Sequence, residues 1–302
     1  MKLTIKFLEH RWVGYIITIL MFTTFITGTV MRGGFNWGID FVGGIKVIAH
    51  FNSAVRVAEI RHTLEQSGIK GEVQQFGNEQ NNEFVISTRL PERRAGEQQA
   101  AGQLQGADLI ERTLANAYRD NVRIIGREEV GPTIGEYLKK SAIYLVFWCI
   151  LLMALYLAFR FETLFSLGAM FMICHDVALS FLFCGFMGLE INIPIIAGVL
   201  TIFGYSINDT IIVYDRIREN MAAMAKQSFR EIANRSINQV LMRTILTTFT
   251  TLMAVFCLYI IGESVINDFA ELLLFGFACG VFSTVYIAVP VVYEWKRRTE
   301  EA

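Results

Sequence analysis

Two charged residues lie within or beside long apolar segments, and they are the side chains best placed to carry chemistry. Asp209 lies inside the apolar run from Pro194 to Tyr214, and Arg243 lies at the start of the next run, Thr244 to Ile261. An ionised side chain in hydrocarbon costs roughly 2.5–3.5 kcal/mol on insertion scales, so it persists only where it faces a bundle interior or water. The two residues therefore predict an intramembrane site that binds or transfers a proton or another cation.

The residues just before Asp209 support such a site. Asn208 precedes it directly, and Tyr205 and Ser206 come one helical turn earlier. Positions three and four apart share a helix face, so we expect Tyr205, Ser206 and Asp209 to point the same way. The alternative is a carboxylate at the end of a helix at the membrane surface, a description that fits Asp215 better.

A row of hydroxyl groups follows Arg243. Thr247, Thr250 and Thr251 come four, seven and eight residues later, on the helix face that Arg243 begins. Such a row either joins helices by hydrogen bonds or lines a hydrated path. An Asp on one helix and an Arg on the next are natural partners, so we expect Asp209 and Arg243 to pair. An Arg in this position is also what snorkelling to the membrane surface would give by itself.

A second intramembrane carboxylate, Asp176, directly follows His175 inside another apolar segment. Adjacent residues of a helix point about 100° apart, so we do not expect these two to form a dyad. Asp176 is expected either to hydrogen-bond another helix or to join the polar core around Asp209. The apolar segments contain no second His and no paired-Asp or Ser–His protease motif. We therefore expect no catalytic residue, no metal and no cofactor.

Composition and hydropathy indicate a membrane protein. Hydrophobic residues make up 53% of the chain, and six apolar windows are each long enough to cross about 30 Å of hydrocarbon. The first window is as long as a full span and lacks a small-residue cleavage site, so it predicts a retained signal-anchor. The expected fold is a polytopic α-helical membrane protein with six transmembrane helices. The predicted spans are Trp12–Met31, Ser141–Phe159, Leu164–Met187, Ile193–Tyr214, Thr244–Ile261 and Phe269–Tyr293.

Lys and Arg residues are concentrated in segments that would all lie on one side of the membrane. The short loops on the other side, Gly188–Asn192 and Gly262–Asp268, carry acidic residues and no Lys or Arg. The positive-inside rule makes the basic side cytoplasmic, with both termini, and places the long segment after the first span outside. The basic residues are Lys2, Lys6, Arg11, Arg160, Arg216, Arg218, Lys226, Arg230, Arg235, Lys296, Arg297 and Arg298.

The segment 33–136 is polar and long enough to form a small domain between the first two spans. Its pattern predicts the order β-α-β-β-α-β, which is the ferredoxin-like arrangement of an α/β domain. The chain then divides into an N-terminus with the first transmembrane helix (1–32), this outside domain (33–136) and a five-helix membrane domain (137–302). The expected strands are Gly43–Phe51, Gly71–Phe76, Glu83–Leu90 and Val122–Val130, with helices at Ser53–Ser67 and Ala95–Tyr118 and a turn at Gly77–Asn82.

The connector 215–240 between the fourth and fifth spans is predicted to contain an amphipathic helix. Ser228 and Glu231 form the Ser-x-x-Glu capping box that opens such a helix. Apolar and small residues then recur at helical spacing, with polar residues on the other faces. We expect a cytoplasmic elbow that lies at the membrane surface. Docking of a cytoplasmic partner is the alternative role for this segment.

Four motifs, taken in order along the chain, resemble one family. They read GIDFVGG at Gly38–Gly44, HD at His175–Asp176, SINDTIIVYDRIREN at Ser206–Asn220 and RTILTT at Arg243–Thr248. Together with the number of spans and the place of the outside domain, they make the whole chain similar to the SecF family. Its members are the smaller subunit of the bacterial SecD–SecF translocation factor, in the resistance–nodulation–division superfamily.

The resemblance implies a role in protein export. Members of the family pair with SecD in the bacterial cell inner membrane, often together with a small subunit called YajC, and associate with the SecYEG channel. The resemblance also implies that the proton motive force drives the periplasmic domains to pull unfolded preprotein outward after SecA has acted. H⁺ is the implied ion and Na⁺ is the alternative. No nucleic-acid partner is expected.

The motif match assigns a proton or ion relay to Asp209 and Arg243, and we add Asp176 as a third member. SecD would supply a further intramembrane carboxylate that this chain lacks. The residues predicted to support the relay are Asn208, Ser206, Thr247 and Thr250.

The motif after the first span is predicted to be a hinge for the outside domain. Its glycines permit backbone angles that other residues avoid, at the point where the span meets the domain. A plain turn into the first strand is the alternative. The predicted hinge residues are Gly38, Asp40, Gly43 and Gly44.

Two other classes of function compete with a translocation subunit. A drug or lipid export pump of the same superfamily usually carries two halves in one chain, and this chain has one. A structural or assembly subunit would use the same charges only to hold helices together. Exchanging the charges of Asp209 and Arg243 separates the classes, because a structural ion pair survives inversion and a proton relay does not.

Overall fold

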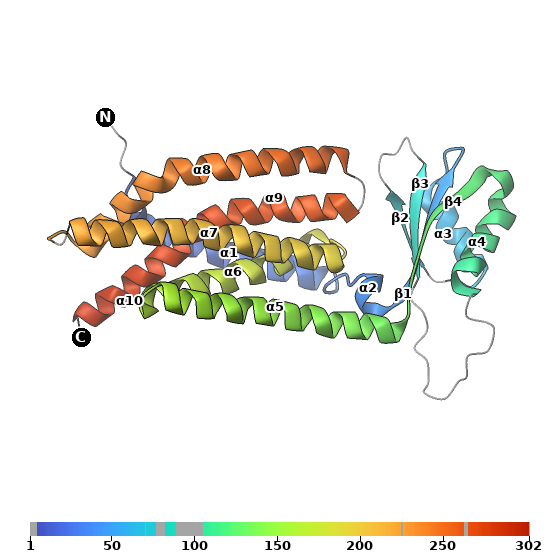
Figure 1. Cartoon of the computed structure of the whole chain (residues 1–302). Coiled ribbons are helices and arrows are strands. Elements are labelled where there is room, and N and C mark those ends of the chain that lie inside the picture. The colour runs from blue at the N-terminus through green and yellow to red at the C-terminus, as the bar shows by residue number, and fades with distance from the viewer. Residues whose placement is uncertain are drawn as a thin grey trace.

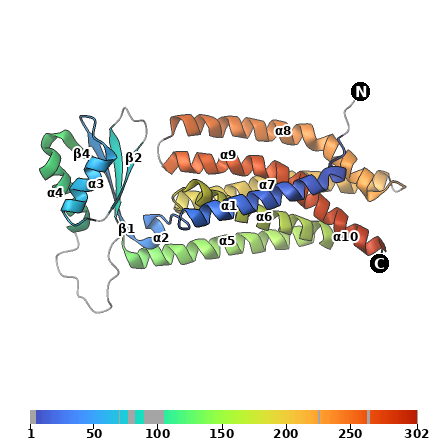
Figure 2. The ribbon, with the colours of Figure 1, turned by 180° about the vertical axis from the view of Figure 1, so that it is seen from behind.

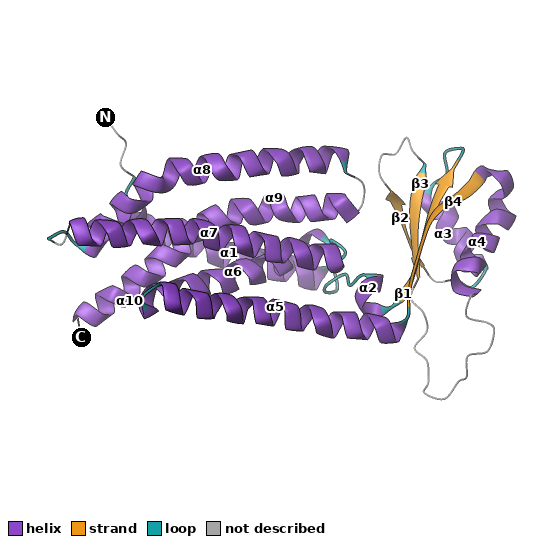
Figure 3. Ribbon diagram, viewed as in Figure 1, coloured by secondary structure: helices purple, strands orange, loops and turns teal. Residues whose placement is uncertain are grey.

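The computed structural model describes residues 5–69, 71–76, 82–88, 105–224, 226–262 and 265–301. These residues form a long helical bundle and, at one end of it, a small sheet with two helices (Figure 1). All strands of the described residues lie in the small part (Figure 3). Both ends of the chain lie at the far end of the bundle, as an even number of membrane crossings requires.

Six helical segments are long and apolar enough to cross a membrane, which confirms the predicted number of spans. Several of them are longer than their apolar runs, because a nucleated helix continues into polar residues at little cost. α5 (Pro132–Arg160) starts well before the expected Ser141, and α7 (Ile193–Ala223) continues past Tyr214. Two further segments are single helices, α6 (Thr163–Met187) and α8 (Phe229–Ile261). Another is α1 (Arg11–Met31), which follows the 3-10 turn η1 (Phe7–His10). The last begins as α9 (Val265–Ser283) and continues through the π-helical turn η4 (Thr284–Ala288) into α10 (Val289–Glu301).

Three of the six segments form the centre of the bundle. In α6, in α7 and in the segment of α9, η4 and α10, between 50% and 67% of the apolar window is buried, against 6–11% for α1, α5 and α8. Figures 1 and 2 place α8 at one edge of the bundle and α5 at the opposite edge. Apolar helices that bury so little of themselves in their own chain must be covered by lipid or by another protein.

The sheet has the strand order β2-β3-β1-β4, and each neighbouring pair is antiparallel. Helix α3 (Val57–Gln66) joins the first two strands, and helix α4 (Gln105–Tyr118) with the short turn η3 (Arg119–Asn121) precedes the last. The strands are β1 (Gly44–Phe51), β2 (Gly71–Phe76), β3 (Glu83–Thr88) and β4 (Val122–Val130).

One core joins the sheet to its two helices. Alternate residues of β1 are fully buried, which is the period-2 pattern of a strand with one covered face. Arg127 of β4 also donates a hydrogen bond to Asp108 of α4 at 2.9 Å, and this bond raises the pKa of Arg127. The central residues of the core are Ile45, Val47, Ala49, Phe51, Ile60, Leu64, Ile110 and Leu114.

The strands at Gly71–Phe76 and Val122–Val130 have the predicted limits. β1 begins one residue later than predicted because Gly43 takes a φ of +73°, far from the negative φ typical of strands. Parts of three other predicted elements lie outside the described residues: 77–81 of the turn, 89–90 of the third strand and 95–104 of the second helix.

The connector 215–240 is divided between two long helices. α7 continues to Ala223, and α8 begins at Phe229 and runs to Ile261 without a break. Ser228 accepts a hydrogen bond from the N–H of Glu231, and the Glu231 carboxylate accepts one from the N–H of Ser228, which is the expected capping box. The apolar side of these first turns packs into the bundle through Ile232, Ala233 and Ile237.

α7 and α9 approach each other closely because glycines face the contact. A Cβ added to Gly276 of α9 would lie 2.1 Å from Cδ1 of Ile202, and one added to Gly280 would lie 3.2 Å from Cβ of Ser206. Small residues four positions apart are a usual means of close helix packing in membranes. This contact sets the width of the gap in which Asp209 lies.

A methyl group added at this contact is expected to destabilise the bundle. Gly276→Ala should lower the free energy of unfolding by about 1–3 kcal/mol, the usual cost of overpacking. Gly204→Ala in α7 is the matched control, because a Cβ there meets no atom within 4 Å and Ala is the better helix former. Thermal unfolding of both purified variants in detergent measures the difference. Equal midpoints would contradict the close contact.

Candidate functional site

Asp209 faces a narrow gap between α7, α8 and α9, with 8% of its surface exposed. The gap encloses a cavity of about 10 Å³, which is close to the space needed by one water molecule. Hydroxyl groups from α7 and α8 and glycines from α9 form much of its wall. The lining residues are Tyr205, Ser206, Asp209, Thr248, Thr251, Gly276, Phe277, Gly280 and Val281.

The expected ion pair between Asp209 and Arg243 is not formed among the described residues. Arg243 is exposed on α8, whereas the next residue, Thr244, is 2% exposed against the bundle. The register of α8 therefore turns Arg243 outward, although its charge still acts on Asp209 through space. Within the described residues Asp209 also accepts no side-chain hydrogen bond, so its carboxylate has no fixed partner.

The threonines of α8 occupy two faces of the helix. Thr247 and Thr250 are exposed, and their hydroxyl groups donate to the carbonyl oxygens of Arg243 and Thr247 at 3.0 and 2.9 Å. Thr248 and Thr251 instead line the cavity beside Asp209. The predicted supporting residues Thr247 and Thr250 thus lie outside this cavity, whereas Thr251 of the same row lines it beside Thr248, which the row did not include. The spacing 244, 248, 251 also describes one helix face, and packing decided between the two.

Of the other two predicted supporting residues, one lines the cavity and one does not. Ser206 is 3% exposed and lines the cavity. Asn208 is exposed and is not among the residues that line the cavity. Sequence reasoning also missed Gly276 and Gly280, although their spacing in the sequence GFACG is a recognisable signal for close helix packing.

Asp176, the second intramembrane carboxylate, joins three helices. It is 2% exposed on α6. Its Oδ2 accepts hydrogen bonds from the hydroxyl groups of Ser206 on α7 and Ser283 on α9, the second at 2.8 Å. Ser206 also lines the cavity beside Asp209, so this one residue lies between the two carboxylate sites. The structure therefore brings Asp176 and Asp209 into one polar region at the centre of the bundle.

The expectation that His175 and Asp176 would not interact is wrong. Nδ1 of His175 lies 2.8 Å from Oδ1 of Asp176. The two side chains leave the helix in different directions, but each is long enough to bend toward the other, and both are confined in the bundle at 7% and 2% exposure. Nε2 of His175 has no partner among the described residues, and its ring lies 5.5 Å from that of Phe22 in α1.

The predicted hinge motif is a compact junction built around a short helix, α2 (Ile39–Val42). The N–H of Gly38 donates to the carbonyl oxygen of Ile191 at 2.8 Å. The Asp40 carboxylate accepts a hydrogen bond from the N–H of Ile193 at 3.0 Å. The chain that leaves α1 is thus fixed to the loop between α6 and α7 before it enters the sheet.

The two glycines after α2 are required by close backbone contacts. Gly43 has a positive φ, and a Cβ there would lie 2.8 Å from Cα of Pro132, at the start of α5. A Cβ on Gly44 would lie 2.7 Å from the carbonyl oxygen of Thr88 in β3. The junction therefore holds α1, α5 and the sheet together through backbone atoms.

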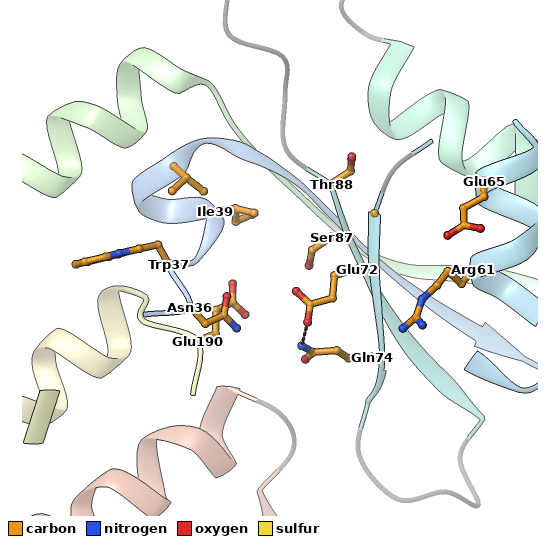
Figure 4. Close-up of a pocket in the computed structure, with 12 residues that line it drawn as sticks. Asn36, Trp37, Ile39, Arg61, Glu65, Glu72, Gln74, Ser87, Thr88 and Glu190 are labelled. Atoms are coloured by element: carbon orange, nitrogen blue, oxygen red, sulfur yellow. Dashed lines mark hydrogen bonds between the residues drawn. The ribbon is translucent and has the colours of Figure 1, made fainter. Parts of the chain in front are cut away.

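A cleft of about 780 Å³ separates the sheet from the loops of the membrane part. Its size lies in the range of ligand pockets, roughly 300–1,000 Å³. Figure 4 shows Glu72, Gln74 and Ser87 of the sheet on one side and Trp37 and Glu190 on the other. The lining also includes Asn36, Ile39, Val42, Arg61, Glu65, Gly71 and Thr88.

A partly buried ion pair connects the two sides of this cleft. Lys46 of β1 is 7% exposed, and its Nζ lies 3.0 Å from Oε2 of Glu190 in the loop between α6 and α7. Removing one partner of a buried pair is costly because the other charge is left without compensation. The pair therefore fixes the sheet to the membrane part at a second point beside the glycine junction.

These features define a class of protein: a multi-pass membrane protein with six spans, buried carboxylates at its centre and a small α/β part after the first span. A family model described as "Protein export membrane protein SecD/SecF, C-terminal" matches residues 110–298. The chain belongs to this SecD/SecF family.

Relatives agree over nearly the whole chain. The protein translocase subunit SecF of Endomicrobium trichonymphae is 36% identical over 98% of this chain and 93% of its own length. That of Desulfurispirillum indicum is 35% identical over 88% of this chain and 83% of its own. The protein translocase subunit SecDF of Thermus thermophilus is 36% identical over 92% of this chain but 37% of its own length. The relatives are named as translocase subunits, which is a transport function and not an enzymatic one.

Two solved structures of SecDF are also similar. The Thermus thermophilus protein, described as translocon-associated, superposes with a TM-score of 0.84 at 34% identity and covers 98% of this chain. A SecDF in a super-membrane-facing form gives a TM-score of 0.70 at 33% identity over 100% of this chain. This chain spans 39% and 40% of the lengths of those two proteins.

Loss of the Glu190 charge is expected to loosen the junction. Glu190→Ala leaves the Lys46 ammonium buried without a partner, at a cost of about 3 kcal/mol. Amide hydrogen exchange in β1 should then become faster. Glu136→Ala is the matched control, because Glu136 pairs with Lys140 at 2.8 Å on an exposed surface, where ion pairs contribute little. Equal exchange in both variants would show that the buried pair does not fix the sheet.

Proposed function

We propose that this chain is a SecF-like subunit of the protein-export machinery, which acts with SecD and the proton motive force to promote late translocation of preprotein through SecYEG into the periplasm. The observation that carries the proposal is Asp209. It is a buried carboxylate in a membrane span, with no fixed partner among the described residues and with space for one water beside it. A carboxylate in such a place is most often part of an ion or proton pathway.

The exposed helix α8 supports a protein partner at the Asp209 gap. α8 forms one wall of the cavity, and its apolar outer surface is uncovered by the rest of the described chain. One relative is a SecDF protein in which the part matched by this chain is 37% of the whole. We infer that SecD covers this side of α8 and completes the ion path, and that YajC is a further partner.

The relay residues have distinct roles in this proposal. Asp209 binds the proton, or Na⁺ as the alternative, and Arg243 supplies a positive charge that acts on it through space. Asp176, supported by His175, is the inner carboxylate, and Ser206 connects the two sites because it donates to Asp176 and lines the Asp209 cavity. A change in the charge of Asp209 alters its attraction to Arg243, so α8 is the helix expected to move.

The movement would reach preprotein through the outside domain, residues 33–136. The strand order supports a ferredoxin-like arrangement of this domain. In the proposal the domain lies in the periplasm, both termini lie in the cytoplasm and the spans cross the inner membrane. Gly38, Asp40, Gly43 and Gly44 are the proposed hinge. The SecDF structure in the super-membrane-facing form superposes on this chain with a lower TM-score than the other SecDF structure does. This difference supports a change, within the family, in how the outside domain sits on the membrane part. Unfolded preprotein would bind this domain.

The energy available is sufficient for such a movement. One charge that crosses 100 mV releases about 2.3 kcal/mol. This shifts a two-state equilibrium by roughly 50-fold, at about 1.4 kcal/mol for each factor of ten. A few protons per cycle would therefore move a hinged domain between two positions.

Asp209→Asn is expected to stop export while the protein still assembles. The variant keeps the shape of the side chain but cannot exchange a proton, so preprotein processing should fall by up to roughly 50-fold if the energy of one proton is lost. Pulse-labelling in cells whose only copy carries the change measures processing, and co-purification with SecD checks assembly. Asp215→Asn is the control, since Asp215 pairs with Arg160 at 2.8 Å on the surface. Normal export by Asp209→Asn would remove the central residue of the proposal.

A structural subunit is the second candidate, favoured by the way Asp176 joins three helices through hydrogen bonds. The charge exchange Asp209→Arg with Arg243→Asp separates the two candidates. A structural role that rests on the attraction between these two charges through space predicts that the double variant exports preprotein normally while each single variant fails. A relay predicts that the double variant assembles with SecD and still fails to export, because no carboxylate remains at position 209.

A further inference from the structure

An apolar groove lies between α5 and the centre of the bundle, at the end near the sheet. Its volume is about 170 Å³. It lies beside α5, a peripheral helix in which Gly135 and Leu157 are the only buried residues among those described. The lining residues are Trp37, Phe41, Lys139, Ala142, Ile143, Val146, Phe181 and Ile196.

One end of the groove carries an uncompensated positive charge. Nζ of Lys139 lies 4.7 Å from the centre of the Trp37 ring, and Lys139 has no carboxylate partner within the described residues. The neighbouring Lys140 differs, because it pairs with Glu136 at 2.8 Å. At about 1.5 Å per residue, Lys139 lies roughly 10 Å from the start of α5 at Pro132. A Trp and a Lys at this depth are typical of the membrane–water interface.

The groove opens toward lipid. Ile143 and Phe147, on the outer side of α5, are 61% and 56% exposed. A helix has an overall diameter of about 10–12 Å, so a partner helix would be too wide to enter a groove of this volume. A flexible alkyl chain is narrow enough, and its burial among apolar side chains is favourable.

We propose that this groove binds an anionic phospholipid from the leaflet nearer the sheet. The phosphate group lies at Lys139, and one acyl chain follows Ala142, Val146 and Ile196 into the bundle. The charge of Lys139 selects the headgroup, and the narrow apolar walls select the chain. The proposal is independent of proton coupling, since it uses none of the relay residues.

Native mass spectrometry of the full chain with added phosphatidylglycerol tests the proposal, with phosphatidylcholine as the comparison lipid. Wild type should retain one phosphatidylglycerol more tightly than phosphatidylcholine. Lys139→Ala should weaken this binding about fivefold, the contribution of one basic residue near an anionic lipid. Ala142→Trp should abolish it by filling the groove. Lys140→Ala and Ala158→Trp, on the exposed sides of α5, are the matched controls and should bind as wild type does.

Three results would overturn the proposal. Equal retention of the two lipids by wild type would remove the selection by Lys139. Unchanged retention in both Lys139→Ala and Ala142→Trp would place the lipid elsewhere. A photo-reactive residue at Ile143 that crosslinks in membranes to a polypeptide instead of to lipid would identify a protein as the occupant.

Discussion

The carboxylate of Asp176 is the point at which the three central helices meet, and the arrangement of the membrane part depends on it. A polar group in hydrocarbon must find partners within the protein, because neither lipid nor bulk water supplies them. Asp176 finds them on α7 and α9, through Ser206 and Ser283. These bonds and the glycines of α9 fix the spacing of α7 and α9. That spacing in turn creates the narrow cavity in which Asp209 is held.

The three outer helices complete a different kind of surface. α1, α5 and α8 bury few residues in their own chain, so their apolar sides must be covered by lipid or by another protein. α8 offers one wall of the Asp209 cavity, which suits it to contact with a partner subunit. α5 leaves a groove with a basic end, which suits it to lipid. An exposed apolar helix therefore suits a protein partner at α8, where Asp209 lies behind it, and lipid at α5, where Lys139 lies at the end of the groove.

The connection between the membrane part and the sheet is made by backbone contacts and one partly buried charge pair. Gly43 and Gly44 allow the start of α5 and the edge of β3 to approach the chain that leaves α1. Lys46 and Glu190 join the first strand to the loop between α6 and α7. The sheet is thus joined to the loop between α6 and α7 over short links.

The sequence by itself determined the six spans, the strands of the small part and the identity of the buried carboxylates, because hydropathy, alternation and the cost of buried charge are local properties of the chain. Tertiary structure alone decided which partners those carboxylates have. The register of α8 turned Arg243 outward and Thr248 inward, although a threonine row on either face was compatible with the spacing. Contact between His175 and Asp176 likewise required confinement by neighbouring helices. Side-chain pairing depends on how helices rotate against one another, and that rotation is set by packing distant in the sequence.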